Sequence, residues 1–404
     1  MTVSQDPKGK VRCSPEQRSD SAPPQVRCSP EQRSDSAPPQ GGYDLAVVGA
    51  GVIGLACAWR AAQAGMSVVV LERDVPGSGS SGVAAGMLAP VTEADFGEQT
   101  LLALNLESRE MWPGFATELE ELTGLPTGYV DCGALVVAAD RDDAQELRRL
   151  HDFQRRLGLD SEWLGPRAAR SLEPGLSPRI GGAVLAPRDA QVDPGAVVAA
   201  LAQALEDAGG ELRSGTEVVS LETGSGRVTG LRTAAGERVR TSQVLVAAGA
   251  WSSQGELADA AGAPEVRPVK GQLLELRVRR GGGLPASRLV RTPRCYVVGR
   301  ADGRVVIGAT MEEQGFDTTI TAGGVFRLLE AAYEVLPDIG ELELVRARAG
   351  LRPFTSDNTP VVGAGPIDGL LWATGHGRNG VLLAPLTALR TVDELCGATA
   401  IVSA

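Results

Sequence analysis

The segment that decides the fold is YDLAVVGAGVIGLACAWRAAQAGMSVVVLE, residues 43–72. Its residues 45–48 form an apolar run, which is typical of a buried parallel strand. Gly49, Gly51 and Gly54 follow at the spacing G-x-G-x-x-G. In a strand–turn–helix unit the first glycine permits a tight turn, the second lets the backbone approach a pyrophosphate, and the third lets the helix pack closely on the strand.

The residues after these glycines place an acidic side chain at the end of a second strand. Residues 52–64 predict the helix, whose N-terminal N–H groups favour an anion and whose first turn contains Ile53. Residues 67–71 predict a strand that ends at Glu72. A carboxylate there can accept hydrogen bonds from both hydroxyls of an adenosine ribose. The segment therefore predicts a dinucleotide-binding site.

The composition is typical of a globular enzyme. The chain has 404 residues, of which 43% are hydrophobic, so it is long enough for two domains or for one domain with a large insertion. Its net charge of −11 argues against nucleic-acid binding. The sequence has neither an apolar run of about 18 residues nor the apolar core of a secretory signal, so we expect no membrane span and a cytoplasmic location. Six cysteines without metal-ligating spacing and only two histidines argue against a metal site.

The N-terminal tail, residues 1–41, contains a tandem repeat. The sequence VRCSPEQRSDSAPPQ occurs at 11–25 and again, unchanged, at 26–40. It is rich in Ser, Pro, Gln and mixed charge and has almost nothing to bury. We therefore predict that the tail is disordered and that its removal leaves activity intact.

The middle of the chain leaves the nucleotide-binding sheet and returns to it. Residues 100–122 and 142–157 have the apolar spacing of amphipathic helices, with a strand expected at 135–138 between them. Residues 244–247 then predict another buried strand of the first sheet. Most of the intervening chain is therefore inserted into that sheet.

A second excursion begins near Pro268, and the two excursions divide the chain into two interleaved parts. We predict an α/β fold in which a Rossmann-like dinucleotide-binding domain carries an inserted α+β substrate domain. The dinucleotide-binding domain takes residues 42–90, 191–265 and 345–404, and the substrate domain takes residues 91–190 and 266–344.

Five motifs in a fixed order resemble those of a known family. They are AAGMLAP at 84–90, PVKGQ at 268–272, GATM at 308–311, GLRP at 350–353 and GHGRNGVLLAP at 375–385. With the glycine-rich segment, they resemble the FAD-dependent amine oxidases, which include D-amino-acid oxidase, sarcosine oxidase and glycine oxidase. The likeness is closest to the glycine oxidases of thiamine thiazole synthesis. It implies a D-amino-acid oxidase-like fold with FAD as the dinucleotide.

The resemblance also implies where FAD is bound. The ADP half would lie on Gly49, Gly51, Ile53, Gly54 and Glu72, with the adenine against the backbone of Val218. The other candidate cofactor contacts are Ser80, Ser81, Ala85, Gly86, Met87, Gly249, Trp251, Gly377, Asn379 and Gly380. No cysteine stands where it would obviously tether the flavin, so noncovalent binding is expected.

An amino-acid oxidase also needs a cation for the substrate carboxylate, because a buried carboxylate without a partner is unfavourable. Arg352 suits this role, since a guanidinium pairs with a carboxylate through two parallel hydrogen bonds. By resemblance, Tyr296 would add a hydroxyl donor and Arg378 a second cation at the pocket edge. Met87 and Met311 would form soft walls beside a small substrate.

The reaction implied by the resemblance is oxidative deamination of glycine, and of other small amines such as sarcosine or D-alanine. The neutral amine would pass its α-hydrogen as hydride to flavin N5, and O2 would reoxidise the flavin. The products are an imine or glyoxylate, ammonia and hydrogen peroxide, and no catalytic histidine is required. Arg294 stands where some glycine oxidases carry histidine, and its charge at the pocket mouth could alter substrate choice.

Other functions stay open at this point. The enzyme could prefer sarcosine, a D-amino acid or proline, or could pass electrons to a carrier instead of O2. A flavin- or NAD-binding protein without catalysis is the alternative outside the enzymes. By resemblance we expect a homo-oligomer without nucleic-acid or membrane partners, whose imine product could pass to a thiazole-forming enzyme.

Overall fold

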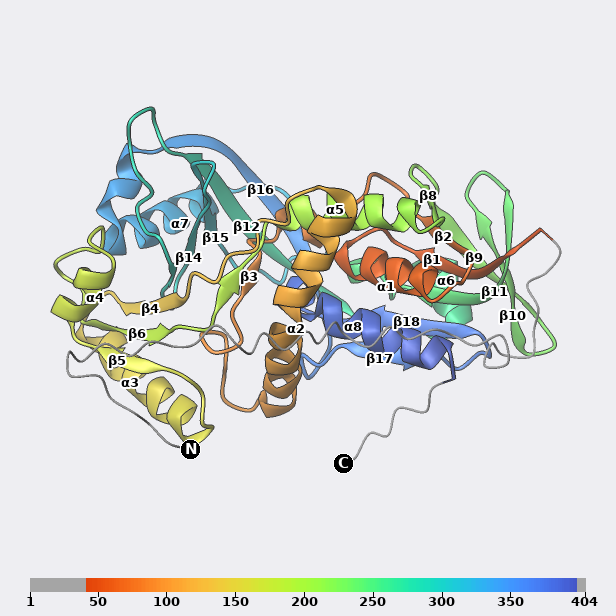
Figure 1. The fold of residues 1–404 in the computed structure, drawn as a ribbon, viewed down its shortest axis with the longest axis horizontal. Helices are drawn as coiled ribbons and strands as arrows, with labels where there is room; N and C mark the ends of the chain where they lie inside the picture. Colours follow the sequence, from red (N-terminus) through yellow and green to blue (C-terminus); the bar gives the residue numbers. More distant parts are fainter. Residues whose placement is uncertain (1–40, 398–404) are drawn as a thin grey trace, which may run out of the picture.

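A computed structural model describes residues 41–397, so the predicted tail and its repeat lie almost entirely outside the described residues. Figure 1 shows two lobes, each built on an eight-stranded sheet, and the long strand β16 (Glu343–Phe354) reaching from one lobe towards the other. The predicted fold class, a Rossmann-like FAD-binding domain with an inserted α+β domain, is confirmed.

The first sheet has a parallel centre with the order β17-β18-β11-β1-β2-β8. Its parallel strands are β1 (Tyr43–Val48), β2 (Val68–Leu71), β8 (Glu211–Arg213), β11 (Arg238–Val246) and β18 (Leu370–Thr374). An antiparallel edge strand β17 (Val361–Ala364) and the strands β9 (Val218–Gly224) and β10 (Arg227–Thr233) complete it. The strand expected at 244–247 is the end of β11, whose first three residues pair with β10.

Helices α1 (Val52–Gln63), α2 (Gln99–Thr123), α5 (Pro194–Asp207) and α8 (Gly380–Leu395) pack together on the first sheet, and the short helix α6 (Gly255–Ala261) contacts β9. Their shared core contains the fully buried indoles of Trp59 and Trp112. Helix α5 begins at Pro194 because the Asp193 carboxylate accepts a hydrogen bond from the N–H of Gly195, at 3.0 Å.

The second sheet has the order β16-β12-β15-β14-β13-β4-β6-β5. Its other strands are β4 (Ala134–Ala138), β5 (Glu162–Leu164), β6 (Gly182–Ala186), β12 (Arg267–Arg277), β13 (Leu289–Arg291), β14 (Tyr296–Gly299) and β15 (Arg304–Gly308). Its helices are α3 (Arg141–Arg156), α4 (Pro166–Leu172) and α7 (Ala322–Val335). The remaining elements are a small sheet of β3 (Met87–Leu88) and β7 (Ala190–Gln191) and the 3-10 turns η1 (Ser80–Val83), η2 (Gly249–Trp251) and η3 (Pro337–Glu341).

Two elements pack in a different lobe from the domain to which the predicted boundaries assign them. Strand β16 pairs with β12 along its length, from Glu343 opposite Arg277 to Phe354 opposite Arg267, so residues 345–354 belong to the second sheet. Helix α2 lies within the range 91–190 but packs on α8, and the indole of Trp112 donates to the carbonyl of Leu382 at 2.9 Å. Apolar periodicity marks a strand or helix but does not identify its partner.

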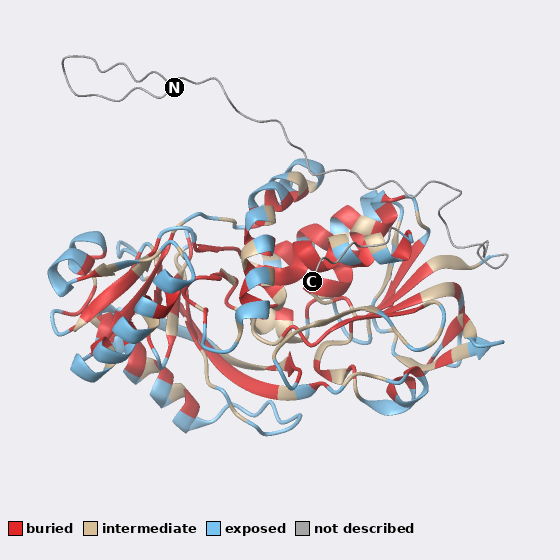
Figure 2. Cartoon of the chain, turned by 90° about the horizontal axis from the view of Figure 1, so that it is seen from below, coloured by how far each residue is buried: buried red, intermediate tan, exposed pale blue. Residues whose placement is uncertain are grey.

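The buried residues follow the strands and the inner faces of the helices in both lobes, as Figure 2 shows. Each lobe therefore has its own hydrophobic core. Among residues 41–397 there is no helix with the length and apolar character needed to cross a bilayer. Over the same residues, no group of His, Cys, Asp and Glu side chains is arranged to hold a metal ion.

Candidate active site

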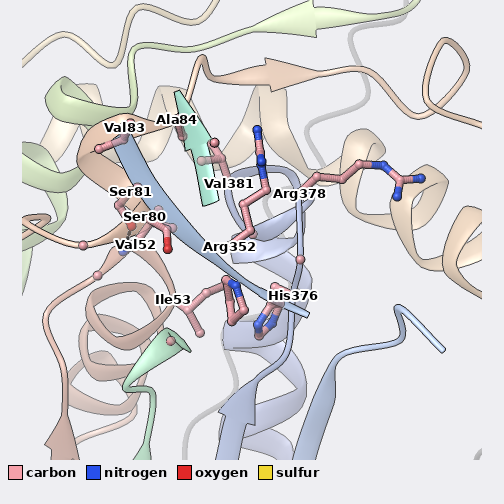
Figure 3. Close-up of a pocket in the computed structure, with 18 of the residues that line it drawn as sticks. Val52, Ile53, Ser80, Ser81, Val83, Ala84, Arg352, His376, Arg378 and Val381 are labelled. Carbon is pink, nitrogen blue, oxygen red and sulfur yellow. Dashed lines mark hydrogen bonds between the residues drawn. The ribbon is translucent and has the colours of Figure 1, made fainter. Parts of the chain in front are cut away.

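A cavity of about 1550 Å³ opens at the carboxyl ends of β1, β2, β11 and β18 and continues to β14 and β16 of the second sheet. This edge of a parallel α/β sheet is where ligands bind in doubly wound folds. Its volume exceeds that of ordinary small-ligand pockets and leaves room for a dinucleotide and a substrate together. Figure 3 shows part of the lining, with Arg352 on β16 and the residues of η1 on the other side of that strand.

The three glycines of the opening motif differ in what they face. Gly49 and Gly51 line the cavity, and Gly49 has φ +103°, a conformation that favours glycine. A Cβ at Gly49 would lie 2.7 Å from the carbonyl oxygen of Ala247. Gly54 does not line the cavity, and a Cβ there would lie 2.0 Å from the Gly49 carbonyl oxygen. Gly54 therefore permits the close packing of helix on strand.

The first turn of α1 is capped from another segment. Its N-cap residue, Gly51, has no side chain, and the N–H of Val52 donates instead to the Ser81 hydroxyl at 3.0 Å. Ser81 is buried and lines the cavity, and Ile53 lines it from the same first turn. One N–H group at the start of this helix therefore already has a hydrogen-bond acceptor within the chain. The sequence predicted Ser81 as a cofactor contact but not as the cap of this helix.

Glu72 lies at the end of β2 with its carboxylate fixed by the backbone. One oxygen accepts from the N–H of Ala50 at 2.8 Å and the other from the N–H of Asp74 at 3.0 Å. Each carboxylate oxygen retains a second lone pair for a hydroxyl donor. Glu72 lines the cavity, as a ribose-binding acid would.

The segment of Ala85, Gly86 and Met87 lines the cavity and is held in place by a buried arginine that the sequence analysis did not identify. Arg300 is 7% exposed and donates to the carbonyl oxygens of Ala85 and Val192, both at 2.7 Å. Gly86 has φ +75°, and a Cβ there would lie 2.1 Å from the Val192 carbonyl oxygen. The sequence carries no signal for this role, because Arg300 is one of 39 basic residues outside the recognised motifs.

The other predicted cofactor residues come together around the same cavity, with one exception. Val218, Ser80, Gly249, Trp251, Gly377 and Gly380 line it. Asn379 does not, although it is buried and its Oδ1 has no hydrogen-bond partner among the described residues. The neighbouring His376 lines the cavity and contacts the Thr387 hydroxyl through Nε2, at 2.9 Å. Burial lowers the pKa of His376 to about 3, so this imidazole is neutral at physiological pH.

The part of the cavity formed by the second sheet contains Arg352 on β16 and Tyr296 on β14. The Arg352 guanidinium donates to the carbonyl oxygen of Thr310 at 3.1 Å and has no carboxylate partner within residues 41–397. Burial raises the pKa of Tyr296, and the Arg352 charge opposes this rise. The phenol is therefore a hydrogen-bond donor at neutral pH, and Arg352 is a cation available to an anionic ligand.

The other residues predicted at the substrate end have different surroundings from those expected. Met87 packs against the apolar cluster near Tyr296, whereas Met311 is 67% exposed and borders the cavity from its rim. Arg378 lines the cavity but is paired with Glu98, and its side chain extends away from Arg352 in Figure 3. Arg294 also lines the cavity, and it forms an ion pair with Glu334 of α7.

The family profile described as "FAD dependent oxidoreductase" matches residues 44–394. The chain belongs to this family. It is similar to a protein named glycine oxidase from Geobacillus kaustophilus, with 38% identity over 355 residues, 87% of this chain and 92% of the relative. It is also similar to the bifunctional protein ThiO/ThiG of Trichormus variabilis, with 36% identity over 352 residues, 87% of this chain and 52% of the relative. A crystal structure of the Geobacillus kaustophilus glycine oxidase superposes with a TM-score of 0.81 at 37% identity, covering 87% of this chain and 94% of that one.

The described residues of this FAD-dependent oxidoreductase fit its cofactor. The cavity joins a glycine-lined helix start to a fixed carboxylate at Glu72, and side chains at Gly49 or Gly86 would collide with backbone carbonyls. Cys295 is a free, buried thiol in the lining, and burial raises its pKa, so it is protonated at neutral pH. A thioether to the flavin would need the reactive thiolate that this environment disfavours, which is consistent with noncovalent FAD.

Proposed function

We propose that this enzyme oxidises glycine, and other small amines such as sarcosine or D-alanine, to an imine that hydrolyses to the oxo acid and ammonia, with O2 as electron acceptor and hydrogen peroxide as product. The observation that carries the proposal is Arg352: a guanidinium that lines the cavity of an FAD-dependent oxidoreductase without a carboxylate partner within residues 41–397. The similarity to glycine oxidases supports glycine as the substrate.

The described side chains have distinct roles in this proposal. Gly49, Gly51 and Glu72 would hold FAD, which would supply the acceptor for a hydride from the substrate carbon. Arg352 binds the substrate carboxylate through parallel hydrogen bonds, and the Tyr296 hydroxyl donates to the same group. Met87 limits the space beside the substrate from the cavity wall, and Met311 does so from the rim. His376 stays neutral and carries no charge that would compete for the carboxylate.

The first experiment is a peroxide assay of the purified full-length protein with glycine, sarcosine, D-alanine and D-proline, after its visible spectrum is recorded. We expect a flavin spectrum and peroxide from glycine. The variant Arg352→Ala should keep the flavin and lose activity, whereas Arg390→Ala, which removes a surface ion pair with Glu107, should keep both. Reduction of the flavin by glycine without peroxide would indicate a dehydrogenase, and no reduction by any of the four amines would refute the substrate class.

The relative that combines ThiO and ThiG in one chain supports a place for the product in thiamine thiazole synthesis. We therefore propose that the imine passes to a thiazole-forming partner. Co-purification or a coupled assay with such a partner would test this, and free exchange of the imine with solvent would contradict it. The homo-oligomeric state and the cytoplasmic location remain predictions from the sequence.

A further inference from the structure

Arg378 faces the same cavity as Arg352, but acceptors surround all three of its guanidinium nitrogens. Its Nε lies 3.7 Å from a carboxylate oxygen of Glu93, and its Nη1 lies 3.4 Å from Oε1 of Glu98. Its Nη2 donates to Oε2 of Glu98 and lies 3.3 Å from the carbonyl oxygen of Glu93. Glu98 thus occupies the edge formed by the two Nη groups, and the Nε edge faces Glu93.

The two acids are held in position by further contacts. Glu98 directly precedes α2 and accepts a hydrogen bond from the side-chain amide of Asn358 at 2.7 Å. Glu93 lines the cavity and lies 3.7 Å from Arg291. The side chains of Glu93 and Glu98 are only 12% and 15% exposed. Burial raises the pKa of Glu98, but the hydrogen bond and charge of Arg378 outweigh burial and lower it, so Glu98 is ionised at neutral pH.

Arg352 has the opposite environment. Its guanidinium donates to the neutral carbonyl of Thr310 at 3.1 Å and hydrogen-bonds with the Tyr296 side chain, and no acidic side chain within residues 41–397 pairs with it. Of these two guanidinium groups, only that of Arg352 is therefore available to an anion, while that of Arg378 is neutralised by Glu98 and by Glu93, which itself lines the cavity. If a ligand had a second carboxylate, that group would lie near Glu93 and would find no free cation to pair with. A buried charge without a partner is strongly unfavourable.

We propose that Glu93 and Glu98 are specificity-determining residues: by occupying Arg378, they restrict the enzyme to amines that carry a single carboxylate and exclude amino dicarboxylates. This inference rests on the proposed function, in which Arg352 binds the substrate carboxylate. Arg378 is then a second carboxylate-binding site that Glu93 and Glu98 block in the wild-type enzyme. Removal of one acid charge opens that site without a change at Arg352.

The test compares glycine with iminodiacetate, a small secondary amine with two carboxylates, in Glu98→Gln and Glu93→Gln holoenzymes. We expect the ratio of kcat/KM for iminodiacetate to that for glycine to rise at least tenfold, chiefly through a lower KM for iminodiacetate. Adding Arg378→Gln to Glu98→Gln should abolish the gain. Glu107→Gln in α2 removes a surface ion pair with Arg390 and serves as the matched control, with an unchanged ratio.

A binding measurement separates this inference from the proposed function. Acetate and malonate are titrated against the holoenzyme, and their dissociation constants are read from the flavin absorbance. Glu98→Gln should bind malonate at least tenfold more tightly, with little change for acetate. The inference is wrong if the wild-type enzyme oxidises glycine but folded Glu98→Gln and Glu93→Gln leave two quantities unchanged. These are the kcat/KM ratio of iminodiacetate to glycine and the ratio of the dissociation constants of malonate and acetate. If no amine reduces the flavin, the proposed function fails and the malonate titration still decides the role of the two acids.

Discussion

The guanidinium of Arg352 fills the space in which a side chain at Gly271 would stand. The two residues lie on the paired strands β16 and β12, and Gly271 is directly opposite Gly350. A Cβ built on Gly271 would lie 2.4 Å from Nη1 of Arg352 and 2.6 Å from its Cζ. The absence of a side chain at position 271 therefore leaves the space that the Arg352 guanidinium occupies.

The substitution Gly271→Ala should displace the Arg352 guanidinium and raise the KM for glycine about tenfold or more, because a shift of the anchor misplaces the substrate. The melting temperature and bound FAD should change little, since the colliding atoms belong to the end of a flexible side chain. Steady-state kinetics and thermal unfolding measure both. Gly114→Ala, in α2 with nothing within 4 Å of the added Cβ, is the control. An unchanged KM in Gly271→Ala would show that the anchor tolerates the displacement.

The substitution Arg352→Lys separates charge from geometry. Lysine keeps the positive charge but cannot form two parallel hydrogen bonds to a carboxylate. Loss of one charge-assisted hydrogen bond of about 1.5–3 kcal/mol corresponds to a decrease of roughly 10- to 100-fold in kcat/KM for glycine. Arg352→Ala should decrease it further. Equal activities of Arg352→Lys and wild type would mean that only the charge of Arg352 matters.

The substitution Arg300→Met should weaken FAD binding. It leaves the carbonyl oxygens of Ala85 and Val192 without their donor, at a cost of about 1–3 kcal/mol for each unsatisfied group. We expect a lower melting temperature and a higher dissociation constant for FAD, measured by adding FAD to apoprotein and following flavin fluorescence. Arg188→Met, which removes an exposed ion pair with Glu110, should leave both values unchanged. Wild-type FAD affinity in a folded Arg300→Met variant would contradict the positioning role of Arg300.

Asp189 predicts a defined pH dependence of stability. Its side chain is fully buried, accepts from the N–H groups of Val91 and Thr92 at 3.2 and 3.0 Å, and burial raises its pKa to about 6. The unfolded value is about 3.9, so the folded state binds the proton more tightly. The protonated carboxyl stabilises the folded state fully below about pH 4, and this stabilisation is lost as the pH rises through 6. The loss in the free energy of unfolding is about 3 kcal/mol.

Urea unfolding of wild type and Asp189→Asn between pH 4 and 7 measures this contribution. The free energy of unfolding of the variant, relative to wild type at each pH, should rise by about 3 kcal/mol over that range. The comparison at each pH removes the contributions of the other titrating groups. A constant difference between the two proteins would mean that Asp189 titrates alike in the folded and unfolded states.

The sequence predicted helices and strands correctly where the pattern of apolar residues along the chain is enough to identify them. The strand expected at 135–138 lies within β4, and the helix expected at 142–157 is α3, shifted by one residue. The pairing of Arg378 with Glu98 was missed because the two residues are 280 positions apart in the chain. The same holds for Arg300, 215 positions from Ala85. Such contacts follow from tertiary packing, which periodicity and motif spacing do not encode.

Strand β16 carries Arg352, the proposed substrate anchor, next to a residue that contacts the turn η1. The Ser80 hydroxyl of η1 donates to the carbonyl of Leu351, and Arg352 is the next residue along the strand. The rest of the cavity wall comes from other segments, including those of Glu93 and Met311. In evolutionary terms, a substitution in that wall alters which amine fits the cavity without moving Arg352. The fold thus keeps the reaction geometry constant while it leaves the substrate range open to selection.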